Sequence, residues 1–196
     1  MKLAKFALVP IAAISVAVFA AFAALAGNVV YVAPDGSNTS PYDTWDKATT
    51  NLQTAADLYE EATVVVRGEL PMLNTRLVLD KKTFVYGEDG AVAPLKRGVS
   101  IANAGVVVSN LTLRGHWWGY NSSGAHGVQL NAAGLLTHCT VTNFFTCFGN
   151  DAQGITAYDG GGVGIRAAGA VVRNCTIAGN TCWGKGCGAL PIWKRA

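Results

Sequence analysis

The sequence predicts an all-β solenoid, a fold in which short strands form coils that stack on one another. The first observation behind this prediction is a phrase that occurs three times, at residues 98–113, 127–141 and 162–177, and opens each time with Gly-Val. Its opening glycines lie 29 and 35 residues apart, a period typical of solenoid coils. The second observation is the alternation of apolar residues within each copy, which is the period of a β-strand.

Each copy predicts three short strands separated by corners. In the first strand two apolar side chains point inward, and we expect equivalent side chains to stack in columns from coil to coil. These inward pairs are Val99 and Ile101, Val128 and Leu130, and Val163 and Ile165. After the second strand, Asn110, His138 and Asn174 occupy one equivalent position. Asparagine suits a sharp corner there because it tolerates a left-handed backbone.

The third copy contains a run with a recognisable resemblance. Residues 172–180 read Val-Arg-Asn-Cys-Thr-Ile-Ala-Gly-Asn. With the repeated phrase, this run resembles the coils of right-handed parallel β-helix proteins of the pectate-lyase-like fold, over residues 29–187. The resemblance implies a single-stranded, right-handed parallel β-helix. Proteins of that fold serve as polysaccharide lyases, glycosidases, phage tailspikes and bacterial surface adhesins, so the resemblance is specific for the fold and not for an activity.

Residues 1–26 are expected to be a signal peptide. Lys2 and Lys5 flank the start of an apolar run over residues 6–25, and the stretch ends in Ala-Leu-Ala, a small-residue cleavage pattern. An uncleaved membrane anchor is the alternative, because the run approaches the about 20 residues that span a bilayer. The signal predicts a secreted or cell-surface protein that meets the membrane only through this export signal.

Residues 27–62 are expected to form a strand and an α-helix that closes the N-terminal end of the solenoid. Apolar residues recur at helical spacing from Trp45 to Tyr59, with Asp43 or Thr44 as the N-cap. The leader over residues 31–55 also resembles that of secreted β-helix proteins, in which such a helix covers the first coil. A cap is needed because a bare first coil would expose its strand edges.

The coils are expected to occupy residues 63–188, with strands at 63–66, 76–79 and 83–86 before the first clear copy. Residues 189–196 carry no coil pattern. This tail indicates a truncated solenoid, whose further coils would cover its C-terminal end. The alternative is a short solenoid whose open end is covered by another chain.

Two inserts interrupt the coils, at residues 114–125 and 143–161. Loops inserted into a solenoid usually lie together on one face, often the binding face. Aromatic rings in the first insert suit stacking against sugar rings, and polar groups accompany them. The candidate ligand-binding residues are His116, Trp117, Trp118, Tyr120 and Asn121. The alternative is that both tryptophans fold the loop back over the coil.

The catalytic candidates are weak. Asp151, Asp159 and Arg166 could serve a polysaccharide lyase, which needs carboxylates to hold Ca²⁺ and a base to abstract a proton. Lyases of the similar fold carry such groups on the outward face of one strand column. The outward columns of the three copies, which contain no carboxylate, are Ser100, Gln129 and Gly164, and Ala102, Asn131 and Arg166. We therefore expect no catalysis in this segment and no cofactor, with Ca²⁺ required only by a lyase.

Five cysteines are an odd number for an exported chain, so at least one is unpaired or joins another chain. Cys139 and Cys175 fall on the inward face of stacked third strands, and we expect them to be small core residues first. Cys147 and Cys182 lie in loops that are free to adjust and are the better disulfide candidates. No pattern of Cys and His spacing predicts a metal site.

The expected function is that of a non-catalytic, adhesin-like or glycan-binding β-helix protein, secreted or at the cell surface, with a polysaccharide or cell-surface glycan as partner. The net charge is +3, and its basic residues form no stripe with interleaved aromatics, so nucleic-acid binding is not expected. The alternative is a fragment of a pectate-lyase-like polysaccharide lyase or a glycoside hydrolase, with part of its catalytic coils in missing sequence.

Overall fold

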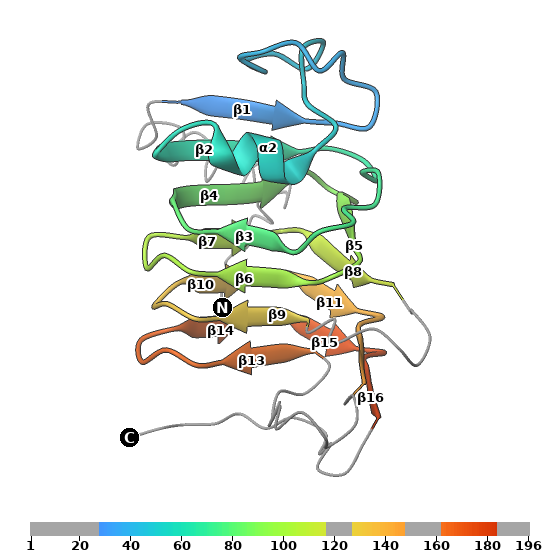
Figure 1. Ribbon diagram of the computed structural model, residues 1–196, viewed down its shortest axis with the longest axis vertical. Coiled ribbons are helices and arrows are strands. Elements are labelled where there is room, and N and C mark those ends of the chain that lie inside the picture. Colours follow the sequence, from blue (N-terminus) through green and yellow to red (C-terminus); the bar gives the residue numbers. More distant parts are fainter. Residues whose placement is uncertain (1–27, 117–126, 148–161, 184–196) are drawn as a thin grey trace, which may run out of the picture.

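A computed structural model describes residues 28–116, 127–147 and 162–183. Their strands form a column of stacked parallel sheets with little helix (Figure 1), and every strand pairing among them is parallel. The prediction of an all-β fold built of parallel strands is confirmed, and the arrangement is compatible with a β-solenoid. The expected signal peptide and the tail at 189–196 lie outside the described residues.

Three larger sheets run the length of the column. The long sheet comprises β1 (Val29–Val32), β2 (Glu61–Val66), β4 (Lys82–Gly87), β7 (Val107–Ser109), β10 (Leu135–Thr137) and β14 (Val171–Arg173). The front sheet, nearest the viewer in Figure 1, comprises β3 (Leu77–Leu79), β6 (Val99–Ile101), β9 (Val128–Leu130) and β13 (Val163–Ile165). The side sheet comprises β5 (Val92–Leu95), β8 (Thr112–Gly115), β11 (Thr140–Thr142) and β15 (Thr176–Ala178). A small fourth sheet pairs β12 (Phe145–Cys147) with β16 (Thr181–Trp183).

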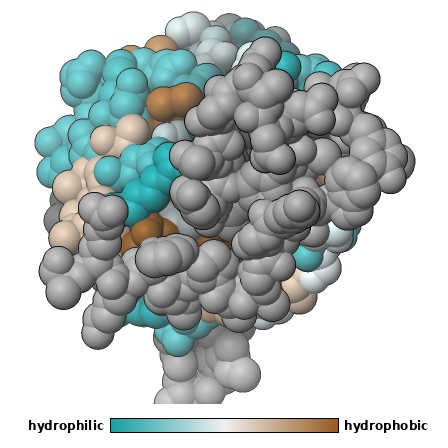
Figure 2. Space-filling model, turned by 60° about the horizontal axis from the view of Figure 1, so that its bottom comes forward, coloured by the Kyte–Doolittle hydropathy of each residue, from teal (hydrophilic) through white to brown (hydrophobic). Residues whose placement is uncertain are grey.

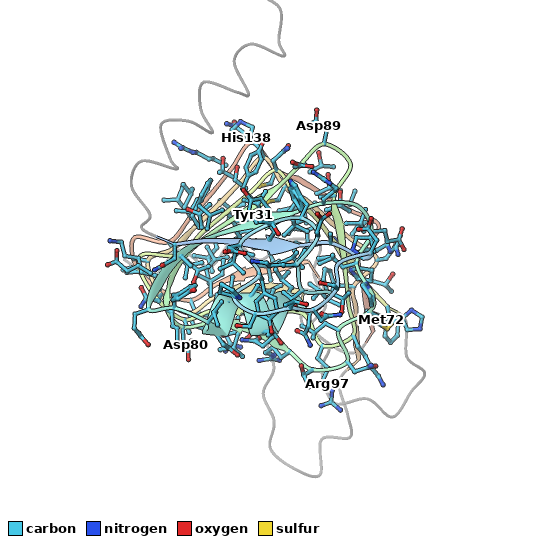
Figure 3. All side chains as sticks on the ribbon, turned by 90° about the horizontal axis from the view of Figure 1, so that it is seen from above. Tyr31, Met72, Asp80, Asp89, Arg97 and His138 are labelled. Atoms are coloured by element: carbon cyan, nitrogen blue, oxygen red, sulfur yellow. The ribbon has the colours of Figure 1, made fainter. Side chains whose placement is uncertain are left out.

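The three copies of the phrase form consecutive coils that are in register, as predicted. In the front sheet the inward side chains of the first two copies are at most 1% exposed, and those of the third copy are partly buried and pack against the core. The successive partners are Val99, Val128 and Val163 in one column, and Ile101, Leu130 and Ile165 in the other. Viewed along the stack, the strands surround the interior that these columns fill (Figure 3).

The polar residue after the second strand of each copy forms the left-handed corner that the sequence predicts. The φ angles are 52° at Asn110, 51° at His138 and 53° at Asn174. Asn110 Nδ2 also donates a hydrogen bond of 2.8 Å to the carbonyl oxygen of Gly87, one coil earlier. The corner is therefore held by the backbone preference of the residue and by a bond between coils.

Replacing Asn110 by Ala tests this corner. A left-handed backbone is unfavourable by roughly 1–2 kcal/mol for an ordinary L-residue, so we expect the free energy of unfolding in urea to fall by about that amount. Asn110→Gly keeps the backbone conformation and loses only the side-chain bond, so it should cost less. Equal losses for the two variants would show that the backbone conformation contributes nothing.

The helix in the N-terminal region is shorter than predicted and begins later. Helix α2 spans Leu52–Asp57, and its N-cap is Asn51, whose side chain accepts bonds from the N–H groups of Gln53 and Thr54. The prediction that the helix starts at Asp43 or Thr44 is wrong. The preceding segment instead follows β1, since Tyr31 N–H bonds to Tyr42 O at 2.8 Å and Thr49 N–H to Tyr31 O at 3.0 Å. Hydrogen bonds to the β1 backbone override the helical spacing there.

Helix α2 packs beside the first strand of the front sheet (Figure 1). It buries Leu52, Ala55 and Ala56. The Gln53 carboxamide accepts a bond of 2.7 Å from Val78 N–H and donates one of 2.9 Å to Val78 O. A neighbouring strand would make the same two kinds of bond. Gln53 therefore occupies the backbone N–H and C=O groups that Val78 would otherwise leave unpaired at the edge of β3. No helix within the described ranges is both long and apolar enough to span a bilayer.

Candidate functional site

Most of the predicted loop site lies outside the described residues. This applies to Trp117, Trp118, Tyr120, Asn121, Asp151 and Asp159. His116 is exposed at the end of β8, where the first insert begins. A Cβ atom at Gly115 would lie 2.5 Å from Phe144 Cα, so the chain at the start of one insert passes directly against the chain at the start of the other. That the rest of the two inserts shares one face stays a prediction.

An ion pair holds the strand that leads into the first insert. Both terminal nitrogens of the Arg114 guanidinium, on β8, donate to the Glu69 carboxylate, with Nη1 at 3.3 Å from Oε2. This hydrogen bonding lowers the pKa of the Glu69 carboxyl below its usual range. Because both side chains are solvent-exposed, the pair fixes geometry more than it adds stability.

The outward face of the front sheet carries the predicted polar columns. Ser100, Gln129 and Gly164 are successive partners, as expected. Arg76 Nη1 lies 3.5 Å from Gln129 Oε1, and Asn131 Nδ2 donates to Ser100 Oγ at 2.9 Å. Gln129 is 2% exposed and Ser100 is 8% exposed. The polar side chains in the middle of this face are therefore buried rather than presented to solvent.

The outward face of the front sheet also carries one carboxylate, Asp80. It directly follows β3, which lies one rung above the first of the three copies. Asp80 follows Leu79, which pairs with Ile101, so Asp80 heads the column that Arg166 ends. Both side chains are exposed. Three rungs separate them, about 14 Å at the usual strand spacing. They cannot act together on one reacting atom, since a general base must reach its proton directly or through one water.

No three His, Cys, Asp or Glu side chains among residues 28–116, 127–147 and 162–183 come close enough to hold a metal ion. A hollow of about 110 Å³ lies beside the start of α2. Ligand pockets usually measure roughly 300–1,000 Å³, so this hollow is too small for a sugar chain. Its walls come from Thr50 to Leu52, Leu70 to Leu73 and Ala93 to Leu95.

The outward face of the long sheet is unusual because one of its columns is mainly apolar. Strand alternation sends Val85, Val108 and Leu136 into the core and their neighbours outward. The outward partners, which we call the apolar column, are Phe84, Val107, Leu135 and Val171. Val171 is 44% exposed, and the other three are partly exposed. The solvent side of a sheet normally carries polar residues, so a continuous apolar column there indicates a contact surface.

The view that brings the lower end of the stack forward shows hydrophobic surface among hydrophilic residues on the described part of the chain (Figure 2). Tyr31, at the upper end of the long sheet, and His138 are labelled in the view along the stack (Figure 3). By register, the outward columns of the long sheet form a strip that runs along the stack from β4 to β14.

Aromatic rings gather toward the upper end of this strip. Phe84 and Tyr86 lie two residues apart on β4, so they share its outward side, and their ring centroids are 6.2 Å apart at an interplanar angle of 34°. Above them, the Tyr31 ring packs at 4.5 Å from the Trp45 ring. The Arg67 guanidinium sits 3.6 Å from the centre of the Trp45 ring. These contacts attach the segment before α2 to the long sheet.

Polar groups follow the strip along its other outward column and its corner. The register places Tyr86, Ser109, Thr137 and Arg173 in one outward column. At the adjoining corner, Asn174 Nδ2 donates to His138 Nε2 at 3.2 Å. His138 Nδ1 lies 2.9 Å from Thr137 Oγ1. We call the outward side of the long sheet the outer face. It comprises the apolar column, the polar column just named, and the corner residues Asn110, His138 and Asn174.

Sequence reasoning missed the outer face, although a signal was present. The second strand of each copy has an apolar residue at the outward position before its buried residue: Val107, Leu135 and Val171. In residues 82–87, Phe84 and Tyr86 alternate with Val85, which is the same signal one coil earlier. The inserts carry a more conspicuous aromatic cluster, which drew the prediction of a binding site away from the outward side of this strand.

Backbone register also bears on the predicted disulfide. In the fourth sheet Cys147 is the partner of Trp183, and Cys182 is the partner of Thr146. The two cysteines are therefore neighbours offset by one residue, and a bond between them stays a prediction.

No protein-family model, curated protein or solved structure matches this chain.

Proposed function

We propose that this chain belongs to an exported, right-handed parallel β-helix protein of the pectate-lyase-like superfamily that binds a polysaccharide or cell-surface glycan without cleaving it. The repeated phrase, the stacked parallel sheets and the in-register columns support the solenoid part of the proposal. Helix α2 is the N-terminal cap in this proposal, because Gln53 satisfies the edge of β3. A secreted protein and an adhesin-like surface protein would use the same scaffold.

The observation that carries the binding proposal is the pair of rings on the outer face. Phe84 and Tyr86 lie on the outward side of one strand with their rings close together, and Phe84 heads the apolar column. A sugar ring presents C–H groups on its faces and hydroxyl groups around its rim. Aromatic rings suit the faces, while the Ser109 hydroxyl offers a hydrogen-bonding group for the rim.

The contacts that the outer face can offer are repeated along the axis of the stack. Its columns repeat at the strand spacing of ~4.8 Å, so an extended polymer lying along the solenoid axis would contact several rungs at once. Each contact is weak, and their combination raises the overall affinity through effective concentration. Proteins that attach to polymers or to cell surfaces need binding of this kind.

A polysaccharide lyase is the second candidate function. Arg166 is exposed on the front sheet in the column that Asp80 heads. A lyase would need Arg166 to work with nearer carboxylates, for which Asp151 and Asp159 are the candidates, and with Ca²⁺. Release of unsaturated uronides from polygalacturonate in the presence of Ca²⁺ would favour this function over binding alone.

Replacing both rings, Phe84→Ala with Tyr86→Ala, tests the binding proposal. We expect the double variant to lose roughly fivefold to 150-fold in affinity for the glycans that the unaltered chain retains on an array, because each stacked ring contributes roughly 0.5–1.5 kcal/mol. The control is Asn131→Ala with Arg166→Ala on the front sheet, which should bind normally. Trp117→Ala with Trp118→Ala tests the predicted loop site in parallel. Normal binding by the Phe84 and Tyr86 variant, with its circular dichroism unchanged, would contradict the proposal.

A further inference from the structure

Two cysteines occupy equivalent positions in successive coils. Cys139 follows the corner at His138 and precedes β11, while Cys175 follows the corner at Asn174 and precedes β15. The strands they precede are in register, and Thr176 N–H bonds to Cys139 O at 2.9 Å. Both side chains are free thiols. The two residues are therefore stacked one rung apart.

The sulfur atoms have a shared environment. Cys139 N–H donates to Cys175 Sγ at 3.5 Å, so the sulfur of the lower coil lies against the backbone of the upper one. Each thiol also points at the carbonyl oxygen two residues before it, at 3.2 Å in both cases. Cys139 is buried, whereas Cys175 is partly exposed. One thiol can therefore be reached from solvent and the other cannot.

The contact between the two cysteines makes their thiols chemically different. The neighbouring Cys139 side chain lowers the pKa of Cys175 to about 6, and the Cys139 N–H that Cys175 Sγ accepts acts in the same direction. The Cys175 side chain, together with burial, raises the pKa of the Cys139 thiol. The accessible thiol is therefore the more acidic of the two, and thiolate is the form of cysteine that reacts.

We propose that Cys139 and Cys175 are a redox pair that closes to a disulfide linking the second and third copies of the coil. The Cα atoms lie about one strand spacing apart, ~4.8 Å, within the usual range for disulfides of 4.4–6.8 Å. Their Cβ atoms need to approach by about 1 Å, which rotation of the two side chains and a small shift of the corner supply. In the reduced state the pair fills the core as the sequence predicts.

The oxidant belongs to the class of low-molecular-weight disulfides, of which glutathione disulfide is the probe. Cys175 thiolate attacks one sulfur of the probe, forms a mixed disulfide and expels the first glutathione thiolate. Cys139 then loses its proton and attacks Cys175 Sγ, which breaks the mixed disulfide and expels the second glutathione thiolate. The protein has lost two protons and two electrons, and glutathione disulfide has become two glutathione molecules.

This link has a structural consequence. It encloses the chain from Cys139 to Cys175, which includes the insert at 143–161, and joins the strands on either side of that insert. Closing a long loop restricts the unfolded chain, so oxidation should raise the melting temperature by several degrees. The outer face, whose corner residues His138 and Asn174 directly precede the two cysteines, would be stabilised with it.

Mass spectrometry of the full chain after treatment with glutathione disulfide tests the proposal. We expect a protease digest to contain a Cys139–Cys175 cross-link that has lost two hydrogen atoms, and dithiothreitol should reverse both the link and the rise in melting temperature. A variant with Cys147, Cys182 and Cys187 replaced by Ser should give the same cross-link, because no other cysteine remains. Persistence of a glutathione adduct on Cys175 with Cys139 unmodified, or a bond from Cys175 to Cys182, would overturn the proposal.

Alkylation of Cys175 as a function of pH gives an independent readout that needs no disulfide. The rate should rise with a midpoint near pH 6, since the lowered pKa sets where thiolate appears. Cys139→Val removes the neighbouring thiol while keeping an apolar side chain, so the midpoint should move up toward the ordinary cysteine value of ~8.5. A midpoint that is the same in both proteins would show that the two thiols do not interact.

Discussion

Replacing Leu130 by Asp should unfold the coils, whereas replacing its neighbour Asn131 by Asp should leave them folded. Leu130 is fully buried and lies between Ile101 and Ile165 in the central column of the front sheet. A carboxylate there has no partner, and burying it costs several kcal/mol. Domains are stable by roughly 5–15 kcal/mol in total, so one such change consumes much of that stability.

Circular dichroism during urea denaturation measures this result. Asn131 is the matched control because it follows Leu130 directly, is exposed, and loses with Asp only its 2.9 Å bond to Ser100 Oγ. The control should unfold cooperatively within about 1 kcal/mol of the unaltered chain. A Leu130→Asp protein that unfolds at the same urea concentration as the control would show that this column is not the core.

Replacing Ala55 by Pro should melt helix α2 and cause self-association. Proline removes the bond from Ala55 N–H to Asn51 O and clashes with the carbonyl of Asn51, which costs about 3 kcal/mol. Gln53 would then no longer hold the backbone of Val78, and the edge of β3 would be free to pair with another chain.

Size-exclusion chromatography with light scattering at several concentrations measures the effect. Thr54→Ala is the control, because Thr54 is exposed on the same turn and its replacement keeps the helix. The control should remain in the state of the unaltered chain, and the proline variant should form larger species as concentration rises. A proline variant that keeps both its oligomeric state and its stability would refute the proposal that α2 caps the N-terminal end.

The repeated part of the fold could be predicted because each coil has the same inward apolar pattern, which it can bury only by stacking on another coil. The period-two pattern of Val99 and Ile101 recurs in the next two copies, and stacking then follows from the need to bury that pattern. The corner at Asn110 was predictable for a different reason. A left-handed backbone restricts the residue type, so Asn and His at one equivalent position already indicate the conformation.

The start of the N-terminal helix could not be predicted from local spacing. Trp45 lies at helical spacing from the later apolar residues, yet its ring packs on Tyr31 of β1. A helix that included Trp45 and the observed packing of Trp45 on β1 would both bury its side chain, so the sequence pattern does not distinguish them. The hydrogen bonds from the preceding segment to the β1 backbone decide between them, and such long-range pairing leaves no local mark.

The outer face could not be predicted from the sequence. The period of two separates the two sides of a strand, but it does not show which side faces the core and which faces solvent. Val107 and Val108 are both apolar, and only the register of the sheet shows that Val108 faces the core while Val107 faces outward. The pairing of Phe84 with Val107 joins a ring from an irregular coil to the column of the regular copies. The pairing of these two residues depends on the order in which the strands stack. The repeat begins at residue 98, so it does not show which earlier strand lies beside the first copy.

The most direct test of glycan binding by the outer face is a titration followed by nuclear magnetic resonance of the aromatic side chains. The ligand is the glycan that the chain retains most strongly on an array, added to the chain with isotope-labelled Phe, Tyr and Trp rings. We predict that the ring signals of Phe84 and Tyr86 shift in proportion to binding and that the glycan is recovered intact. No retained glycan, shifts confined to the aromatic residues at 114–125, or recovery of cleaved and unsaturated sugar would each contradict the proposal.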